Sequence, residues 1–418
     1  MKNSSAEMSG RPLDNIRVLD FSHAAAAPFA TMFLADLGAE IVKIERPGTG
    51  DGARSMGSPM PMLGEKESEY FVALNRNKRS LALDLSVPQG VALAKKLVQK
   101  SDIVFQNFRP GVMDRLGLGF EELRGLREGL VYCSISAFGT SGPLAHQPAN
   151  DIIMQSLSGL MGITGEVGGG PVRIGAPISD YSSGLFAMSG VLAALFARGR
   201  FPDGQHIEVS MLESSLNMMC NYIPSSATLG KAVPRVGRGH AQIVPYQAFL
   251  AADGQYVMVG AFTRIFWQNL CRAVGHIEWI EDPRFRSNHL RLTNRNVLIA
   301  DLEKIFAKRT SLEWLQILDE ADVPSSPVLE LHDAVRSQQV VSAGSICEIG
   351  TGACTIKVAH SPIRSSEWLD CGVGRPAPRL GADSNAVLVE VLGLSANEIS
   401  RLGDEGVVGI AAEAGESI

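Results

Sequence analysis

One carboxylate has the setting of a nucleophile. Asp180 follows a short apolar segment, residues 174–178, that Pro177 interrupts. Small residues at helical spacing over 181–198 predict a helix directly after it. A helix N-terminus stabilises an anion, so we expect Asp180 to stay ionised at neutral pH and to be able to attack a carbonyl carbon. The same position also suits a helix N-cap, and both roles stay open.

Three other segments carry basic side chains next to predicted strands. They are residues 39–47, 75–81 and 106–111, the last continued by 114–117. The basic groups of the first and third segments come just after a strand, and those of the second come just before one. Ligands of open α/β sheets bind at strand ends, and Arg and Lys are the usual partners of phosphates. Each of these side chains, taken alone, is equally compatible with a solvated surface charge, so only the whole set favours a phosphate-bearing ligand.

The elements that would position these groups alternate between strand and helix. Short apolar or β-branched runs predict strands over 16–21, 40–44, 80–85, 103–105 and 130–136. Helical patterns lie between them, from Pro28 to near Gly38, over 88–100 and over 120–126. Such alternation predicts an α/β fold with a parallel sheet that helices cover on both faces.

The chain is longer than one hydrophobic core usually supports. Its 418 residues predict two domains. A hairpin pattern over 246–259 and helical patterns over 266–274, 295–306 and 312–321 favour a smaller α+β domain. We expect residues 1–205 to form the first part of a large domain, 206–229 a linker helix, 230–322 the small domain, and 323–418 a return to the large domain.

Composition excludes several classes of function. The formal net charge is −6 and no basic stripe is visible, so a nucleic-acid partner is not expected. No targeting segment and no uninterrupted membrane span is apparent, which favours a cytoplasmic protein without a membrane partner. The six cysteines form neither a C-x-x-C pair nor a metal-ligand spacing, and no metal is expected. The turn after the first strand, residues 22–27, lacks glycine, which disfavours a dinucleotide site.

Taken together, the ordered series of segments resembles the class III CoA-transferases, also called the CaiB–BaiF family. The resemblance covers most of the chain and includes Ser136-Ala137-Phe138-Gly139, Pro245-Tyr246, Asp253-Gly254, Asp282-Pro283-Arg284-Phe285, Val323-Pro324 and Leu392-Gly393-Leu394. It implies a Rossmann-like large domain built from both ends of the chain, a small domain between them, and two subunits interlocked as a homodimer.

The resemblance also implies roles for particular residues. The family's catalytic aspartate corresponds to Asp180, and the CoA contacts correspond to Arg46, Lys78, Asn107, Phe108 and Arg115. CoA would be a substrate, carried as acyl-CoA, with no permanently bound cofactor. The expected reaction moves CoA from an acyl-CoA to a carboxylic acid, such as a small dicarboxylate, through an aspartyl-CoA thioester.

Two departures leave the substrate open. Residues 24–27 are four alanines where the family often has larger or polar side chains, and Phe138 stands where a tyrosine is common. Both positions line or approach the expected acyl pocket. The glycine-rich segment 165–170 is either a cover for the reaction or a surface turn.

Two other functions compete with CoA transfer. A 2-methylacyl-CoA racemase, which is similar to this family, needs a second proton carrier besides the aspartate. The position that would hold its histidine is Asn150, and His146 lies four residues earlier. The other alternative is a catalytically silent CoA-binding protein with the same fold.

Overall fold

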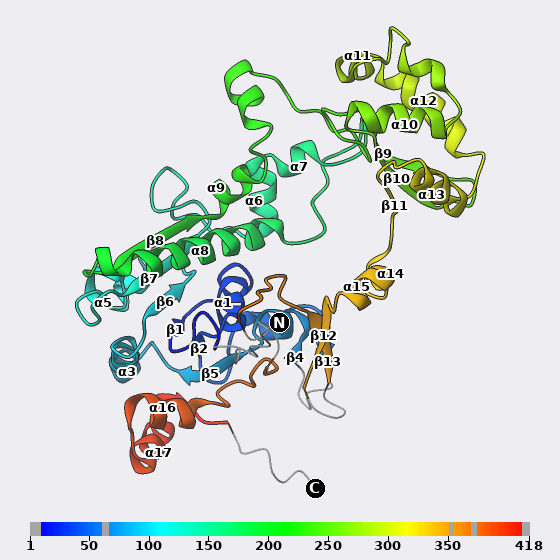
Figure 1. Cartoon of the computed structure of the whole chain (residues 1–418). Coiled ribbons are helices and arrows are strands. Elements are labelled where there is room, and N and C mark those ends of the chain that lie inside the picture. Colours follow the sequence, from blue (N-terminus) through cyan, green and yellow to red (C-terminus); the bar gives the residue numbers. More distant parts are fainter. Residues whose placement is uncertain (1–9, 61–66, 351–354, 369–373, 412–418) are drawn as a thin grey trace, which may run out of the picture. The chain divides into compact units, whose positions relative to one another are not determined.

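The computed structural model describes residues 10–60, 67–350, 355–368 and 374–411. The chain divides into two compact units. The large unit takes the described parts of Met1–Ser158, Gly175–Cys220 and Gln339–Ile418, and the small unit takes Gly159–Ile174 and Asn221–Gln338. Both ends of the chain therefore fold into the large unit, where Figure 1 colours them blue and orange to red.

This division differs from the sequence-based boundaries in three places. Residues 206–220 belong to the large unit, and the glycine-rich segment 165–170 belongs to the small unit. The chain returns to the large unit at Gln339, later than the expected position 323.

A seven-stranded sheet forms the centre of the large unit (Figure 1). In spatial order its strands are β14 (Val408–Gly409), β5 (Lys78–Leu83), β2 (Glu40–Glu45), β1 (Arg17–Asp20), β6 (Ile103–Gln106), β7 (Val131–Ser136) and β8 (Gln205–Ser210). Neighbouring strands are parallel, except that β14 runs antiparallel to β5 at the edge. The predicted α/β fold is confirmed.

The strand order places a switch point at the centre of the sheet. Along the chain, the parallel strands run outward from β1 through β2 to β5, and the chain then crosses back to β6 on the other side of β1. The carboxyl ends of β1 and β6 lie side by side, with Asp20 paired to Phe105. Ligands of doubly wound sheets bind in the crevice at this point.

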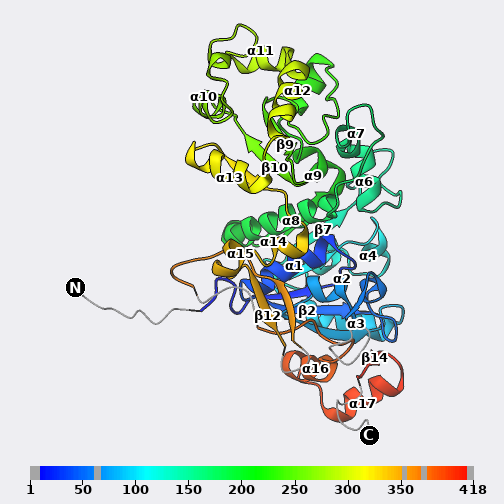
Figure 2. The same cartoon turned by 90° about the vertical axis from the view of Figure 1, so that its right-hand side faces the viewer.

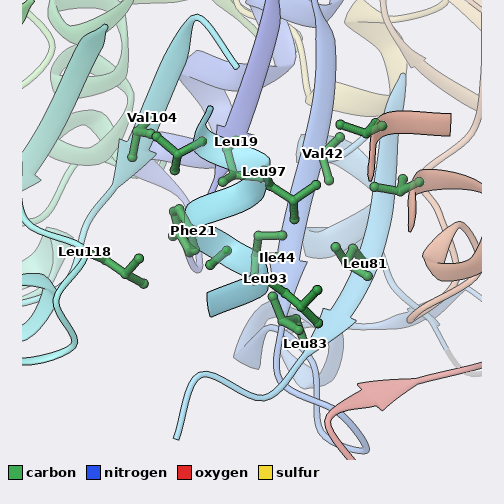
Figure 3. Packing of buried hydrophobic residues seen from close by; sticks show 14 of the residues in the cluster. Leu19, Phe21, Val42, Ile44, Leu81, Leu83, Leu93, Leu97, Val104 and Leu118 are labelled. Carbon is green, nitrogen blue, oxygen red and sulfur yellow. The ribbon is translucent and has the colours of Figure 1, made fainter. Parts of the chain in front are cut away.

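Alternating side chains of the strands build a core on each face of the sheet. Leu19 and Val42 face a cluster that includes residues of α3 (Pro88–Val98), α16 (Ser384–Leu392) and α17 (Ala396–Asp404). Figure 3 shows this cluster at close range. Val18 and Ile41 face the opposite cluster, together with α1 (Ala26–Asp36) and α8 (Ile178–Ala197). This period of two is what a sheet buried on both faces requires.

Helix α8 packs closely on α1 within the large unit (Figures 1 and 2). Gly184 allows the approach, because a Cβ atom there would lie 2.6 Å from the carbonyl oxygen of Ala26. Among the described residues, α8 extended to Arg200 is the one helical stretch whose length and apolar composition would suffice to cross a membrane. Gly184, Ala187, Val191 and Ala194 are nevertheless buried in this packing.

Further elements complete the large unit. Its other helices are α2 (Glu69–Leu74), α4 (Val112–Arg115), α5 (Phe120–Leu123), α6 (Asp151–Ser158) and α9 (Met211–Asn217). Two small antiparallel pairs join β3 (Pro59–Met60) to β4 (Glu67–Ser68) and β12 (Ile346–Ile349) to β13 (Ile356–Ala359).

The small unit is an α+β fold around its own core. The strands β9 (Tyr246–Leu250), β10 (Tyr256–Gly260) and β11 (Ser325–Pro327) form an antiparallel sheet. Its helices are α7 (Leu160–Ile163), α10 (Arg264–Ala273), α11 (Asn288–Thr293), α12 (Arg295–Phe306), α13 (Ser311–Glu320) and α14 (Leu331–Ala334), and α15 (Gln338–Ser342) spans the boundary with the large unit. The core includes Trp267, Phe249 and Phe306. In the small unit, the glycine-rich segment is held by a hydrogen bond from the Gly237 amide to the Gly165 carbonyl oxygen.

Candidate functional site

Two loops meet at the switch point of the sheet. The Asn107 side chain, just after β6, accepts a hydrogen bond from the His23 amide (2.8 Å) and donates one to the His23 carbonyl oxygen (2.8 Å). The next residue, Phe108, packs edge-on against the His23 ring, with the ring centroids 4.8 Å apart. Asn107 therefore fixes the loop after β1, and its amide group is already occupied by that task.

A buried ion pair also holds the loop after β1. Lys43 and Asp51 are fully buried, with 2.9 Å between Nζ and Oδ2. Lys43 Nζ also donates to the Ser22 carbonyl oxygen (2.7 Å), and Asp51 Oδ1 accepts from the Ala24 amide (3.0 Å). Ala24 has φ +59°, a left-handed conformation that is uncommon for alanine. These contacts hold the residue in a conformation that its own backbone preference does not supply.

Lys78 belongs to this buried network and not to a ligand site. Its ammonium group is completely buried and donates to Asp20 Oδ2 (3.3 Å), Asn75 Oδ1 (2.9 Å) and the Pro28 carbonyl oxygen (3.1 Å). Burial lowers the pKa of Lys78 to about 8, even though Asp20 favours the charged form. All three ammonium hydrogens have partners. The buried Lys78 ammonium group is therefore not positioned for direct contact with a CoA phosphate.

Asp180 lies on the wall of a cavity of about 230 Å³ at the carboxyl edge of the sheet. The loops after β1 and β6 and the segment before α6 supply most of the lining, which includes Ala24, Ala25, Ala26, Asn107, Phe108, Arg109, Pro110, Ser136, Gln147, Asn150 and Met211. One water needs only ~10–15 Å³ of such volume, so the cavity has room for a small organic acid. We call it the Asp180 cavity.

The carboxylate of Asp180 is partly buried and has a second carboxylate near it. Within the described residues it accepts no hydrogen bond. Asp151 Oδ1, at the start of α6, accepts from the backbone amides of Ser179 (2.8 Å) and Asp180 (3.4 Å). Burial, followed by repulsion from Asp151, raises the pKa of Asp180 to about 7.

Two expectations about Asp180 need correction. Helix α8 begins at Ile178 after Pro177, so Asp180 lies inside the first turn and is not the N-cap. The pKa of Asp180, raised to about 7, is shifted in the direction opposite to the one expected from the helix N-terminus alone. The helix N-terminus favours the anion, but burial and Asp151 outweigh it.

A second cleft, of about 530 Å³, adjoins the loop on its other side. Arg46 and Phe108 line it together with His23, the carboxylates Glu45 and Asp84, and the apolar residues Phe21, Ile44, Leu83, Leu85 and Leu116. Phe108 lines both hollows. We call the second one the Arg46 cleft. Arg115, at the end of α4, is exposed next to Leu116 but does not line the cleft.

The basic side chains near this edge fall into two groups. Five are held by carboxylates within the large unit, namely Lys43, Arg54, Arg76, Lys78 and Arg79. The side chains of Arg46, Arg109 and Arg115 make no salt bridge or hydrogen bond to any described residue. The second group is exposed and is therefore available to an anionic ligand.

Sequence reasoning missed three residues of this region. Asp151 acts on Asp180 from a separate helix, and no spacing pattern relates the two. His23 lines the Arg46 cleft, and burial lowers its pKa. Arg109 lies in the basic segment 106–111, but the sequence did not indicate a specific function for it. The signal for His23 and Arg109 was their place directly after the predicted strands β1 and β6.

The two residues considered for a proton carrier are placed differently. Asn150 lines the Asp180 cavity, whereas His146 is exposed and is not among the lining residues. An amide does not exchange protons usefully, so the cavity wall offers no second carrier at the position that a racemase would use. Among the described residues, no group of three or more His, Cys, Asp or Glu side chains is arranged to hold a metal ion.

Comparisons with known proteins agree on one family. The model of CoA-transferase family III matches residues 13–384. Succinyl-CoA:glutarate CoA-transferase of Mus musculus is 36% identical over 401 residues, covering 96% of this chain and 91% of the mouse protein. Acetyl-CoA:oxalate CoA-transferase of Acetobacter aceti is 37% identical over 380 residues, covering 91% and 95%. The crystal structure of a CaiB/BaiF family protein from Brucella suis matches with a TM-score of 0.81 at 31% identity, covering 92% of this chain and all of that one.

Proposed function

The chain belongs to the class III CoA-transferase family, and we propose that this enzyme moves CoA from an acyl-CoA thioester to a dicarboxylic acid with Asp180 as the covalent carrier. The observation that carries the proposal is the position of Asp180, on a cavity at the switch point of the sheet and beside the Arg46 cleft. Relatives named for glutarate and oxalate transfer support a dicarboxylate as the acid.

In the proposed chemistry, the Asp180 carboxylate is the nucleophile of the first step and the leaving group of the last. Ionised Asp180 attacks the thioester carbonyl of the donor, which gives a mixed anhydride and expels CoA as a thiolate. The thiolate attacks the aspartyl carbonyl, which forms aspartyl-CoA and releases the donor acid. The acceptor carboxylate then attacks the carbonyl of aspartyl-CoA, which expels the CoA thiolate and forms a second mixed anhydride. The thiolate attacks the acceptor's carbonyl in this anhydride, which gives the new acyl-CoA and releases Asp180 as a carboxylate. Each step exchanges one acyl bond for another, so the energy of the thioester is retained.

The proposed binding mode assigns the nucleotide part of CoA to the Arg46 cleft. Its apolar residues suit a flat base, and Arg46 supplies a cation that makes no salt bridge to a described residue, although the Asp84 carboxylate lines the same cleft. Arg115 is exposed close by on α4, which suits contact with a phosphate. Phe108 lines both hollows, so the pantetheine arm would pass beside it toward Asp180. Asn107 contributes by holding His23 in place.

The proposed assembly is the interlocked homodimer expected for the family. The large unit exposes a set of apolar side chains on α6, α8 and the turn after α9. They are Ile152, Ile153, Leu157, Leu185, Phe186, Phe196 and Met218. Surface patches of this kind commonly mark a protein–protein interface. A cytoplasmic location without a permanently bound cofactor remains part of this proposal.

A panel of acyl-CoA donors against mono- and dicarboxylic acids tests the function. Mass spectrometry of the products should find new acyl-CoA species with wild-type enzyme and none with Asp180→Asn, while calorimetry finds CoA binding retained in the variant. Hydrolysis without transfer to any acid would contradict the proposal. So would full transfer by the variant after deamidation has been excluded.

Racemisation remains the alternative to exclude. Asn150 on the cavity wall argues against it, because the reaction needs a second proton carrier. In deuterated solvent, (R)-2-methylacyl-CoA should keep its α-proton on the timescale of CoA transfer. Exchange at the rate of transfer would favour the racemase, and His146→Ala would then show whether that histidine carries the proton.

A further inference from the structure

The Asp180 cavity contains one cation. Arg109 and Asp180 are the charged residues among those that line it. The other polar side chains of the lining are neutral, and they are Asn107, Ser136, Gln147 and Asn150. A ligand with a negative charge at its far end therefore finds its strongest partner in the Arg109 guanidinium.

The Arg109 guanidinium is free to bind. Among the described residues it makes no salt bridge and no hydrogen bond. Other arginines of the large unit are committed, since Arg76 is bound to Asp36 (2.6 Å) and Arg54 to Glu45 (2.8 Å). A planar guanidinium has five donors in a fork that matches the two oxygens of a carboxylate.

The backbone fixes where the Arg109 side chain begins. Two residues earlier, Asn107 is bound to both backbone polar groups of His23. On the other side, the Val112 amide donates to the Arg109 carbonyl oxygen (3.1 Å) as α4 begins. Arg109 is thus held between the loop after β1 and a helix, where it lines the Asp180 cavity and also a neighbouring hollow of about 180 Å³ that contains Asp114, Glu121 and Glu208.

We propose that Arg109 binds the carboxylate of the dicarboxylic acid that does not react, and so determines that the enzyme prefers diacids. This inference rests on the proposed function and adds the residue that recognises the substrate class. One carboxylate of the acid reacts with the acyl group carried by Asp180, while the other would lie in a cavity whose remaining lining is neutral. Without a cation there, burying that second charge would be costly.

The test compares two acids of equal length with one donor. Acetyl-CoA serves as the donor because its acyl group has no second carboxylate, and glutarate and pentanoate serve as acceptors. In Arg109→Gln, kcat/KM for glutarate should fall about 10- to 100-fold, mainly through KM, as expected for the loss of a charged hydrogen bond. The value for pentanoate should change far less, so the preference for the diacid should fall at least about tenfold. Arg109→Lys should restore part of it.

Arg46→Gln is the matched control. It removes another unpaired arginine, from the cleft assigned to CoA, and should raise the KM for acetyl-CoA equally with both acids. If Arg109→Gln behaves like this control, with weaker CoA binding by calorimetry and an unchanged ratio between the acids, Arg109 contacts CoA and the inference is wrong.

A separate measurement distinguishes a wrong role for Arg109 from a wrong proposed function. Hydroxylamine with acetyl-CoA should label Asp180 in wild type and in Arg109→Gln alike, because acetyl transfer to Asp180 does not involve the diacid. Labelling of Asp180 together with an unchanged acid ratio overturns the role of Arg109 alone. Absence of labelling in both proteins overturns the covalent mechanism on which it rests.

Discussion

The surroundings of Asp180 determine how readily its carboxyl group ionises, and ionisation determines its reactivity. A partly buried carboxylate that accepts no hydrogen bond from the described residues and lies near Asp151 is less stable as an anion than one in water. That makes it a stronger base and a better nucleophile once it is ionised. The unfavourable anion lowers the stability of the folded protein, as is common where active sites trade stability for activity.

Replacing Asp180 by the isosteric asparagine should therefore stabilise the protein at alkaline pH. The folded-state pKa, about 7, lies above the ordinary aspartate pKa of 3.8, so the folded protein holds this proton more tightly than the unfolded chain does. The stability of the wild type falls as pH rises from about 4 to 7, and the asparagine variant lacks this loss. Its advantage in melting temperature should be larger at pH 8 than at pH 4, measured by calorimetry. An advantage independent of pH would contradict the raised pKa.

Asp151 should set the pH at which the enzyme becomes active. In wild type, kcat/KM for the acyl-CoA should rise with pH through about 7, because the proposed mechanism uses the ionised form of Asp180. Asp151→Asn removes the nearby negative charge but keeps an oxygen that can accept from the Ser179 amide. The pKa of Asp180 should fall, and the acidic limb of the profile should move to lower pH. A limb that does not move would show that Asp151 has no electrostatic effect on the nucleophile.

At the scale of elements, the two loops after β1 and β6 form the site, and buried charges hold them. The strands were predictable because β-branched and apolar residues run through them. The partners of their charged residues were not. Lys43 and Lys78 look like surface cations in the sequence, yet both are fully buried against carboxylates from other strands and loops. Only the packed sheet brings Asp20 and Asp51 to them.

Lys78 and Arg115 were both expected to contact CoA, but their replacement by alanine should have different effects. Lys78→Ala removes the ion-pair partner of Asp20 inside the core and leaves it only the hydrogen bonds from Ser22 and Thr31, so the free energy of unfolding in urea should fall by about 3 kcal/mol. Arg115→Ala removes an exposed side chain, so it should leave unfolding nearly unchanged. It should weaken CoA binding by about 1–3 kcal/mol in calorimetry.

The opposite pattern would contradict the division between paired and free cations. If Lys78→Ala unfolds like wild type but loses CoA affinity, its ammonium must reach the ligand in solution. If Arg115→Ala binds CoA with unchanged affinity, the phosphate contact lies elsewhere.

At the scale of the whole molecule, the sequence indicated the architecture more reliably than the boundaries. The parallel sheet and the α+β character of the small unit agree with the expected elements. The edge strand β14 has two residues and β11 has three, too few for any periodicity to mark them. The return at Gln339 depends on which core the chain packs against, which no local pattern encodes.

The exposed apolar side chains on α6 and α8 lead to a prediction about assembly. Phe196 is 87% exposed and Leu157 is 51% exposed, and burial of such side chains in a subunit interface would stabilise a dimer. Light scattering at micromolar concentration should give the mass of a dimer, and dilution should not dissociate it if the subunits are interlocked. A stable monomer would contradict the proposed assembly.

Trapping the covalent intermediate tests the central claim most directly. Incubation with acyl-CoA and hydroxylamine should inactivate the wild-type enzyme, because hydroxylamine converts an activated aspartyl group to a hydroxamate. Peptide mass spectrometry should then find the adduct on Asp180, and acyl-CoA should be required for it. An adduct on Asp151 or Glu166 instead would assign the carrier to another carboxylate. Transfer that continues at its normal rate with no adduct anywhere would contradict a covalent aspartyl mechanism.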